Sequence, residues 1–152
     1  MAYGGMVHAL EEIHRLLKPN GVLIDIHPVA EASLVEIYRN GKIDLVDHWS
    51  VRQWCTDFQQ ADNALAEIVQ RGLFAVERER VFNSLTYYSS VAEMRTDLKE
   101  AIVKYARDAQ SADKAMPDAE ALAARAEELI EDASRSELIM RERAHISRLK
   151  PT

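Results

Sequence analysis

Cysteine is almost absent from this sequence, and glycine and proline are sparse. The 152 residues include one cysteine, Cys55, with five glycines and four prolines. One cysteine excludes an internal disulfide and a multi-cysteine metal site, and it is typical of a reducing compartment. No low-complexity run occurs, which argues against disorder. We therefore expect a globular, cytoplasmic protein with one domain over residues 1–152.

The sequence also lacks an excess of positive charge and any long hydrophobic segment. Its formal net charge is −6, which disfavours nucleic acid and anionic membranes because both attract clustered Lys and Arg. No window approaches the roughly 18 apolar residues of a membrane-spanning helix. The first 17 residues lack the pattern of a signal peptide. We expect no nucleic-acid partner and no membrane partner.

The first half of the chain predicts a helix, a strand and a hairpin. Apolar residues recur at helical spacing over 6–17, and the KPNG segment at 18–21 ends this helix. The apolar, β-branched run 22–28 (VLIDIHP) predicts a strand covered on both faces in a parallel sheet. Asn40-Gly41, between the β-prone stretches of 33–48, predicts a hairpin turn.

The second half predicts three helices and two strands. A capping-box pattern at Ser50 begins a helix that ends near Gly72, and alternation over 73–88 predicts a strand. A second capping box at Ser90 begins a helix whose apolar face includes Tyr105. Two further elements follow: a helix that starts at Pro117-Asp118 and a final strand over 138–152. This order predicts an α/β layered fold, not a helical bundle.

Four segments resemble the C-terminal half of class I S-adenosylmethionine-dependent methyltransferases. ALEEIHRLLKPNGVLIDIHP (9–28) resembles their helix, Lys-Pro-x-Gly turn and fifth strand, with Asn20 where the family usually has a glycine. GLF at 72–74 is similar to the start of the sixth strand, and YYSSVAEMRTDL (87–98) is similar to a Ser-x-x-Glu segment of some members. LKP at 149–151 resembles the end of the seventh strand. The likeness implies a partial Rossmann-like sheet with equivalents of strands 5, 7 and 6, plus a hairpin and flanking helices.

The donor-binding motifs of that family have no counterpart in this sequence. The family sheet has the order 3-2-1-4-5-7-6, and the donor contacts come from a glycine-rich turn after its first strand and an acidic residue at the end of its second. Gly4-Gly5 follows no predicted strand and lacks Gly-x-Gly spacing. The resemblance therefore implies no cofactor-binding residue in this chain, and binding of S-adenosylmethionine only if the missing half completes the fold.

His27 is the candidate catalytic residue. It ends the predicted strand 22–28, and open α/β sheets bind ligands at the carboxyl ends of strands. With Pro28 it is also a candidate substrate-binding residue. Asp25 shares its strand face and could orient the imidazole. The alternative is a histidine with local hydrogen bonds only.

His48 and Trp49 are further candidate substrate-binding residues, because an indole before a capped helix can line a pocket. The alternative is that Trp49 packs against Trp54 as a hydrophobic staple. Cys55 is interpreted as a buried structural thiol.

No metal site is expected from the histidine spacing. His8 and His14 are six residues apart on one helix, and His48 and His145 are scattered. The alternating charges of 77–80 and 141–143 predict opposite-charge pairs between two antiparallel strands.

These observations favour a methyltransferase-like, non-catalytic homodimer that does not bind S-adenosylmethionine alone. The alternatives are a subunit of a split methyltransferase with a donor-binding partner chain, or a fragment of an active methyltransferase that acts on an unknown small molecule. Dimerisation is expected at the strand 22–26, because it lacks its family neighbour and has no protecting edge proline or lysine before Pro28.

Overall fold

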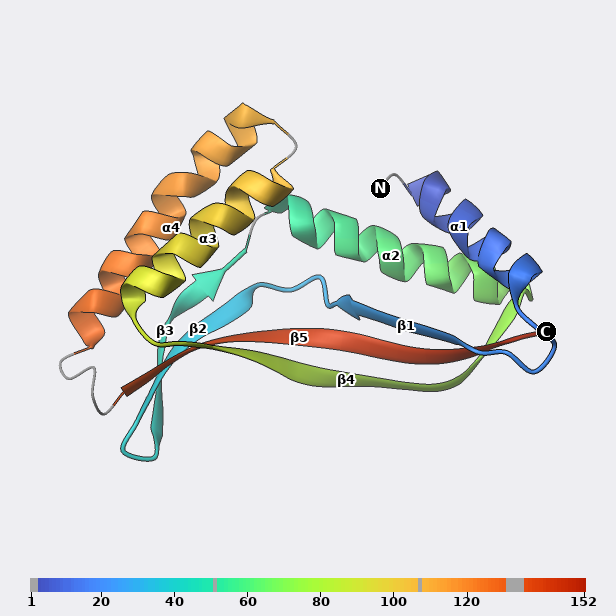
Figure 1. Ribbon diagram of the computed structural model, residues 1–152, viewed down its shortest axis with the longest axis horizontal. Helices are drawn as coiled ribbons and strands as arrows, with labels where there is room; N and C mark the ends of the chain where they lie inside the picture. The colour runs from blue at the N-terminus through green and yellow to red at the C-terminus, as the bar shows by residue number, and fades with distance from the viewer. Residues whose placement is uncertain (1–2, 51, 107, 131–135) are drawn as a thin grey trace. The chain divides into compact units, whose positions relative to one another are not determined.

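The fold combines helices with one antiparallel sheet. The computed structural model describes residues 3–50, 52–106, 108–130 and 136–152, with the backbone alone at 52–55. In chain order the elements are α1 (Tyr3–Leu16), β1 (Leu23–Pro28), β2 (Ser33–Arg39), β3 (Lys42–Trp49), α2 (Arg52–Gln70), β4 (Phe74–Tyr88), α3 (Val91–Tyr105), α4 (Ala109–Leu129) and β5 (Ser136–Pro151) (Figure 1). The predicted α/β class with a hairpin and flanking helices is confirmed. In the described part of the chain, no helix has both the length and the apolar character needed to span a membrane.

The prediction that residues 22–28 form a strand in a parallel sheet is wrong. β1 pairs antiparallel with the C-terminal part of β5, whereas β2 pairs antiparallel with the N-terminal part of β5 and with β3. β4 also pairs with β5, and the sheet order is not Rossmann-like. Ile24 and Ile26 are 50% and 59% exposed, so one face of β1 is uncovered. An apolar run predicts a strand, but it does not specify the direction or the number of the strand's neighbours.

The described residues form two compact units, and the expectation of a single domain stays a prediction. Unit 1 comprises residues up to 31, 54–83 and 143–152. In it α1 and α2 lie on one face of the strands (Figure 1), and their apolar residues form a buried cluster with β4 and β5. This cluster contains Val7, Ala64, Leu65, Ile68, Phe74 and Leu149. The end of the chain is fixed in this unit because the Thr152 N–H donates to the Leu73 carbonyl at 3.1 Å.

Unit 2 comprises residues 32–53 and 84–142. Its hairpin confirms the turn prediction, since Asn40 and Gly41 have φ values of 51° and 77°. α3 begins as predicted: the Ser90 side chain accepts from the Glu93 N–H, and the Glu93 carboxylate accepts from the Ser89 N–H. α3 packs against α4, and the facing apolar side chains are buried. They are Met94, Leu98, Ile102, Ala119, Leu122, Ala123 and Ala126.

Three predicted details differ from the structure. α4 begins at Ala109, because the Asp108 side chain accepts from the Ser111 N–H, and Pro117 lies inside the helix instead of starting it. Tyr105, expected on the apolar face of α3, is 52% exposed. The predicted pairing of 77–80 with 141–143 is also wrong, because the strand register brings other residues together. Glu77 pairs with Arg148 and Lys150, Arg141 pairs with Glu36, and Arg143 pairs with Glu31.

Gly72 ends α2 in a conformation that favours glycine. Its φ is +71°, its N–H donates to the Val69 carbonyl, and the Leu73 N–H donates to the Ile68 carbonyl. This pair of bonds is the Schellman arrangement. We expect Gly72→Ala to lower the free energy of unfolding by about 1 kcal/mol, because alanine is strained at positive φ.

Gly4, inside α1, provides the matched control, since nothing lies within 4 Å of an added Cβ and its φ is ordinary for a helix. Gly4→Ala should therefore stabilise the protein slightly. Urea unfolding of both variants measures the difference. Equal effects of the two substitutions would contradict the conformational explanation.

Candidate functional site

The candidate site lies on the face of β1 that carries Asp25 and His27. Side chains two residues apart on a strand point to the same face, so these two groups are neighbours. The His27 Nδ1 lies 2.6 Å from the Asp25 Oδ2. Strand periodicity allowed a contact between this carboxylate and this imidazole, and the structure contains it.

The antiparallel pairing of β1 with β5 adds a second imidazole. His27 lies directly opposite His145 in the register, and directly opposed side chains share one face of the sheet. The two ring centroids are 5.6 Å apart and the rings are nearly perpendicular, at 83°. The site thus contains one histidine from each of two neighbouring strands.

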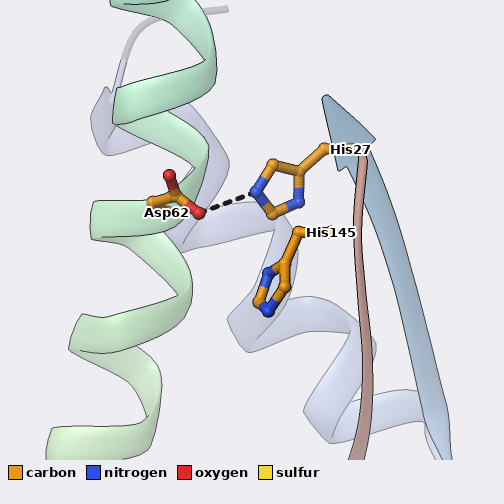
Figure 2. A group of neighbouring side chains, drawn as sticks. All are labelled: His27, Asp62 and His145. Atoms are coloured by element: carbon orange, nitrogen blue, oxygen red, sulfur yellow. Dashed lines mark hydrogen bonds and ion pairs between the residues drawn. The ribbon is translucent and has the colours of Figure 1, made fainter. Parts of the chain in front are cut away.

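α2 contributes the remaining carboxylate. The Asp62 Oδ1 lies 2.8 Å from the His27 Nε2 (Figure 2). Together with the Asp25 contact at Nδ1, this places a carboxylate at each ring nitrogen of His27. Asp62 extends from α2 toward the two histidines of the strands, and all four groups belong to unit 1.

His27 is held in its protonated form. Its hydrogen bond to Asp25 is the main cause that raises its pKa, to about 9, and the bond to Asp62 acts in the same direction. Burial opposes this shift, since only 8% of the residue is exposed, but the two carboxylates outweigh it. Near neutral pH both N–H groups therefore donate, one to each aspartate. His27 is then a cation and a proton donor, not a base.

The same geometry is able to hold a metal ion. His27, Asp62 and His145 each offer one ligand atom, and these atoms all lie within 4.8 Å of one another. Two imidazoles and one carboxylate form a set that binds first-row divalent transition metals. The arrangement can therefore hold a proton between His27 and Asp62, or a metal ion among the three side chains.

The other candidate residues do not join this group. Pro28 follows His27 at the end of β1, in unit 1. His48 and Trp49 belong to β3, in unit 2. The His48 side chain is exposed, at 58%, with its Nδ1 3.9 Å from an Asp47 carboxylate oxygen.

Trp49 is only 4% exposed, which leaves little of its indole available for stacking on a ligand. The predicted staple partner, Trp54, and the predicted structural thiol, Cys55, have side chains outside the described residues.

Sequence reasoning missed Asp62 and His145. His145 was noted only as one of several scattered histidines, because nothing in the sequence specifies the register that places it opposite His27. The implied 5-7-6 order makes strands 22–28 and 138–152 neighbours, and this was the one signal pointing to His145. Asp62 lies in the middle of a predicted amphipathic helix, where a carboxylate is usually exposed to solvent.

Comparisons with known proteins assign the site no function. No family model matches the chain, and searches of curated proteins and of solved structures found no match.

The raised pKa of His27 predicts a pH dependence of stability. A group whose pKa is higher in the folded state stabilises it below the unfolded pKa, near 6.5, and this contribution is lost as the pH rises through about 9. The wild-type chain should have a higher free energy of unfolding than His27→Gln at pH 6.5. We expect this difference to decrease as the pH rises to 9, by at most about 1.4 kcal/mol per pH unit.

Urea unfolding at several pH values measures this difference, and NMR titration of the imidazole gives the pKa directly. His8→Gln is the control, because the His8 side chain is 74% exposed. A His27 titration near 6.5 would contradict the expectation.

Proposed function

We propose that this chain is a methyltransferase-like domain, equivalent to the C-terminal half of the class I fold, that does not bind S-adenosylmethionine alone and forms a homodimer. The observation that carries the proposal is the position of β5, which pairs with both β1 and β4. The resemblance equates β1, β5 and β4 with strands five, seven and six, and it implies this neighbour order.

Two further features support the resemblance within unit 1. α1 comes immediately before β1 in the chain, as expected for the helix that precedes the fifth strand, whereas α2 follows only after β2 and β3. Glu77 of β4 pairs with Arg148 and Lys150, whereas Glu79 lies near His145. As the residue number increases along β4, the number of the contacting residue on β5 decreases, so the two strands run antiparallel. Strands six and seven of the family have the same antiparallel relation. β2 and β3 have no counterpart in the family order, so the proposal rests on unit 1.

The lack of donor binding is proposed from the sequence. The family binds the donor through a glycine-rich turn and an acidic residue of its other half, and neither has a counterpart in these 152 residues. We expect titration calorimetry of the chain with S-adenosylmethionine to give no binding heat at micromolar concentrations. Micromolar affinity for the pure chain would contradict the proposal. An active class I methyltransferase, titrated in parallel, is the positive control.

Self-association is proposed from the uncovered side of β1. Among the described residues, no strand other than β5 pairs with it, so its second edge has no strand neighbour. Ile24 and Ile26 flank this edge and are at least half exposed. An unpaired edge with apolar side chains is a template for another strand, and two copies can pair symmetrically.

We expect light scattering after size exclusion to give twice the 17.2 kDa mass of one chain. Ile26→Lys should yield a monomer, because lysine on an edge strand opposes pairing. Val103→Lys on α3, where the native side chain is 68% exposed, should leave the dimer intact. A monomeric wild-type chain, or equal behaviour of the two variants, would contradict the proposal.

A second candidate function is favoured by the charged, buried His27 at the carboxyl end of β1. In this alternative the chain is a subunit or fragment of an active methyltransferase, completed by a donor-binding polypeptide, and His27 contacts the acceptor substrate. Co-purification with the product of an adjacent reading frame, followed by transfer of labelled methyl groups, tests it. His27→Gln should abolish transfer while His8→Gln retains it, and loss in both or in neither would exclude this role for His27.

A further inference from the structure

We propose that His27, Asp62 and His145 form a binding site for one divalent first-row transition-metal ion of the Zn²⁺ class. Asp25 does not bind the ion itself, and its carboxylate contacts the other ring nitrogen of His27, Nδ1. The proposal does not depend on the methyltransferase-like function, because it is tested by ion binding to the chain itself.

The first argument is the spacing of the ligand atoms. Zn–N and Zn–O bonds of about 2.0–2.2 Å place the ligands of a tetrahedral ion roughly 3.3–3.5 Å apart. The His27 Nε2 and Asp62 Oδ1 are 2.8 Å apart, and all three ligand atoms lie within 4.8 Å of one another. Bringing these atoms to tetrahedral spacing requires shifts of roughly 1 Å, a distance that side-chain rotation can cover.

The second argument is the carboxylate on the other side of His27. Metal-binding histidines generally donate their second N–H to a carboxylate or carbonyl, which fixes the tautomer and makes the ligating nitrogen more basic. The Asp25 Oδ2, 2.6 Å from Nδ1, occupies this position. Nδ1 therefore keeps its hydrogen and Nε2 faces Asp62, so an ion would replace the proton that now lies between Nε2 and Asp62.

The third argument is that rigid elements carry the ligands. His27 and His145 are a directly opposed pair on two hydrogen-bonded strands, and Asp62 lies in the middle of the 19-residue helix α2. Figure 2 shows Asp62 and His27 pointing toward each other, with His145 beside them. Sites built on strands and helices hold their ligands more precisely than sites on loops.

The donor atoms select the class of ion. Imidazole nitrogen suits Zn²⁺ and its first-row neighbours, whereas Mg²⁺ and Ca²⁺ prefer sets of oxygen ligands. Three protein ligands leave at least one coordination position for water or another small ligand. The Asp62 and His145 side chains are 37% and 22% exposed, so solvent reaches the ligands from that side.

Titration calorimetry of the full, tag-free chain with Zn²⁺ tests the site, with Mg²⁺ as the comparison ion. We expect one Zn²⁺ per chain and no comparable binding of Mg²⁺. His145→Gln and Asp62→Asn should each weaken Zn²⁺ binding by at least about 100-fold. Asp25→Asn should weaken it by about 10–100-fold, as is usual for a carboxylate behind a ligating histidine.

His8→Gln is the matched control. The His8 Nδ1 lies 3.6 Å from a Glu11 carboxylate oxygen, but the side chain is 74% exposed and belongs to no group of three metal-ligating residues among those described. Zn²⁺ affinity should be unchanged in this variant. A Zn²⁺ affinity that falls as much in His8→Gln as in His145→Gln would show non-specific binding at surface histidines and overturn the proposal, as would a wild-type chain that binds no Zn²⁺.

Co²⁺ absorption supplies a second measurement. The intense visible bands of a tetrahedral, histidine-ligated Co²⁺ should form with the wild-type chain and with His8→Gln, and they should be lost in His145→Gln. Circular dichroism establishes that each variant is folded. Because Asp62 is a partly exposed helix residue, Asp62→Asn provides a folded test even where a strand variant unfolds. Identical Co²⁺ spectra in all variants would overturn the proposal.

Discussion

The antiparallel register between β1 and β5 is the constraint on which both the core of unit 1 and its candidate site depend. This register pairs Leu23 with Leu149, a buried core residue, and His27 with His145. Because side chains alternate along a strand, a slip of one residue would turn His27 away from Asp62 and bring Ile26 to the covered face. The backbone hydrogen bonds between β1 and β5 therefore fix both the packing of the apolar cluster and the assembly of the polar cluster, which consists of Asp25, His27, Asp62 and His145.

β1 has an inverted pattern of burial, with a polar cluster covered and apolar side chains uncovered. His27 is 8% exposed, whereas Ile24 and Ile26 are at least half exposed. Burial of a charged imidazole is unfavourable unless it is paired, and His27 is paired at both ring nitrogens. A buried polar group and an exposed apolar strand are the two departures from ordinary burial that most often mark function or association. On β1 they lie on opposite faces of one strand.

The net charge of the polar cluster explains how it can hold either a proton or a divalent metal ion. A protonated His27 with the ionised Asp25 and Asp62 has a net charge of −1, so the cluster attracts a cation. When a divalent ion replaces the shared proton, the ion and the two carboxylates balance, and the imidazole becomes neutral. The same arrangement thus stabilises either a proton or a metal ion between His27 and Asp62. The proposed methyltransferase-like function and the proposed ion binding are independent of each other, since the first rests on which strands are neighbours and the second on side chains.

The sequence by itself determined most of the local structure, including the Asn40-Gly41 turn, the capping at Ser90 and the end of α2 near Gly72. These features depend on positive φ or on hydrogen bonds between residues close in sequence, so residue type is enough to predict them. It also determined that Asp25 lies beside His27, because strand periodicity places residues two apart on one face. Only the tertiary structure decided that β1 is antiparallel to β5 and that His145 and Asp62 join His27. Strand direction, register and the helix that covers a sheet face arise from contacts between residues 35 to 118 positions apart, and periodicity contains no information about such pairs.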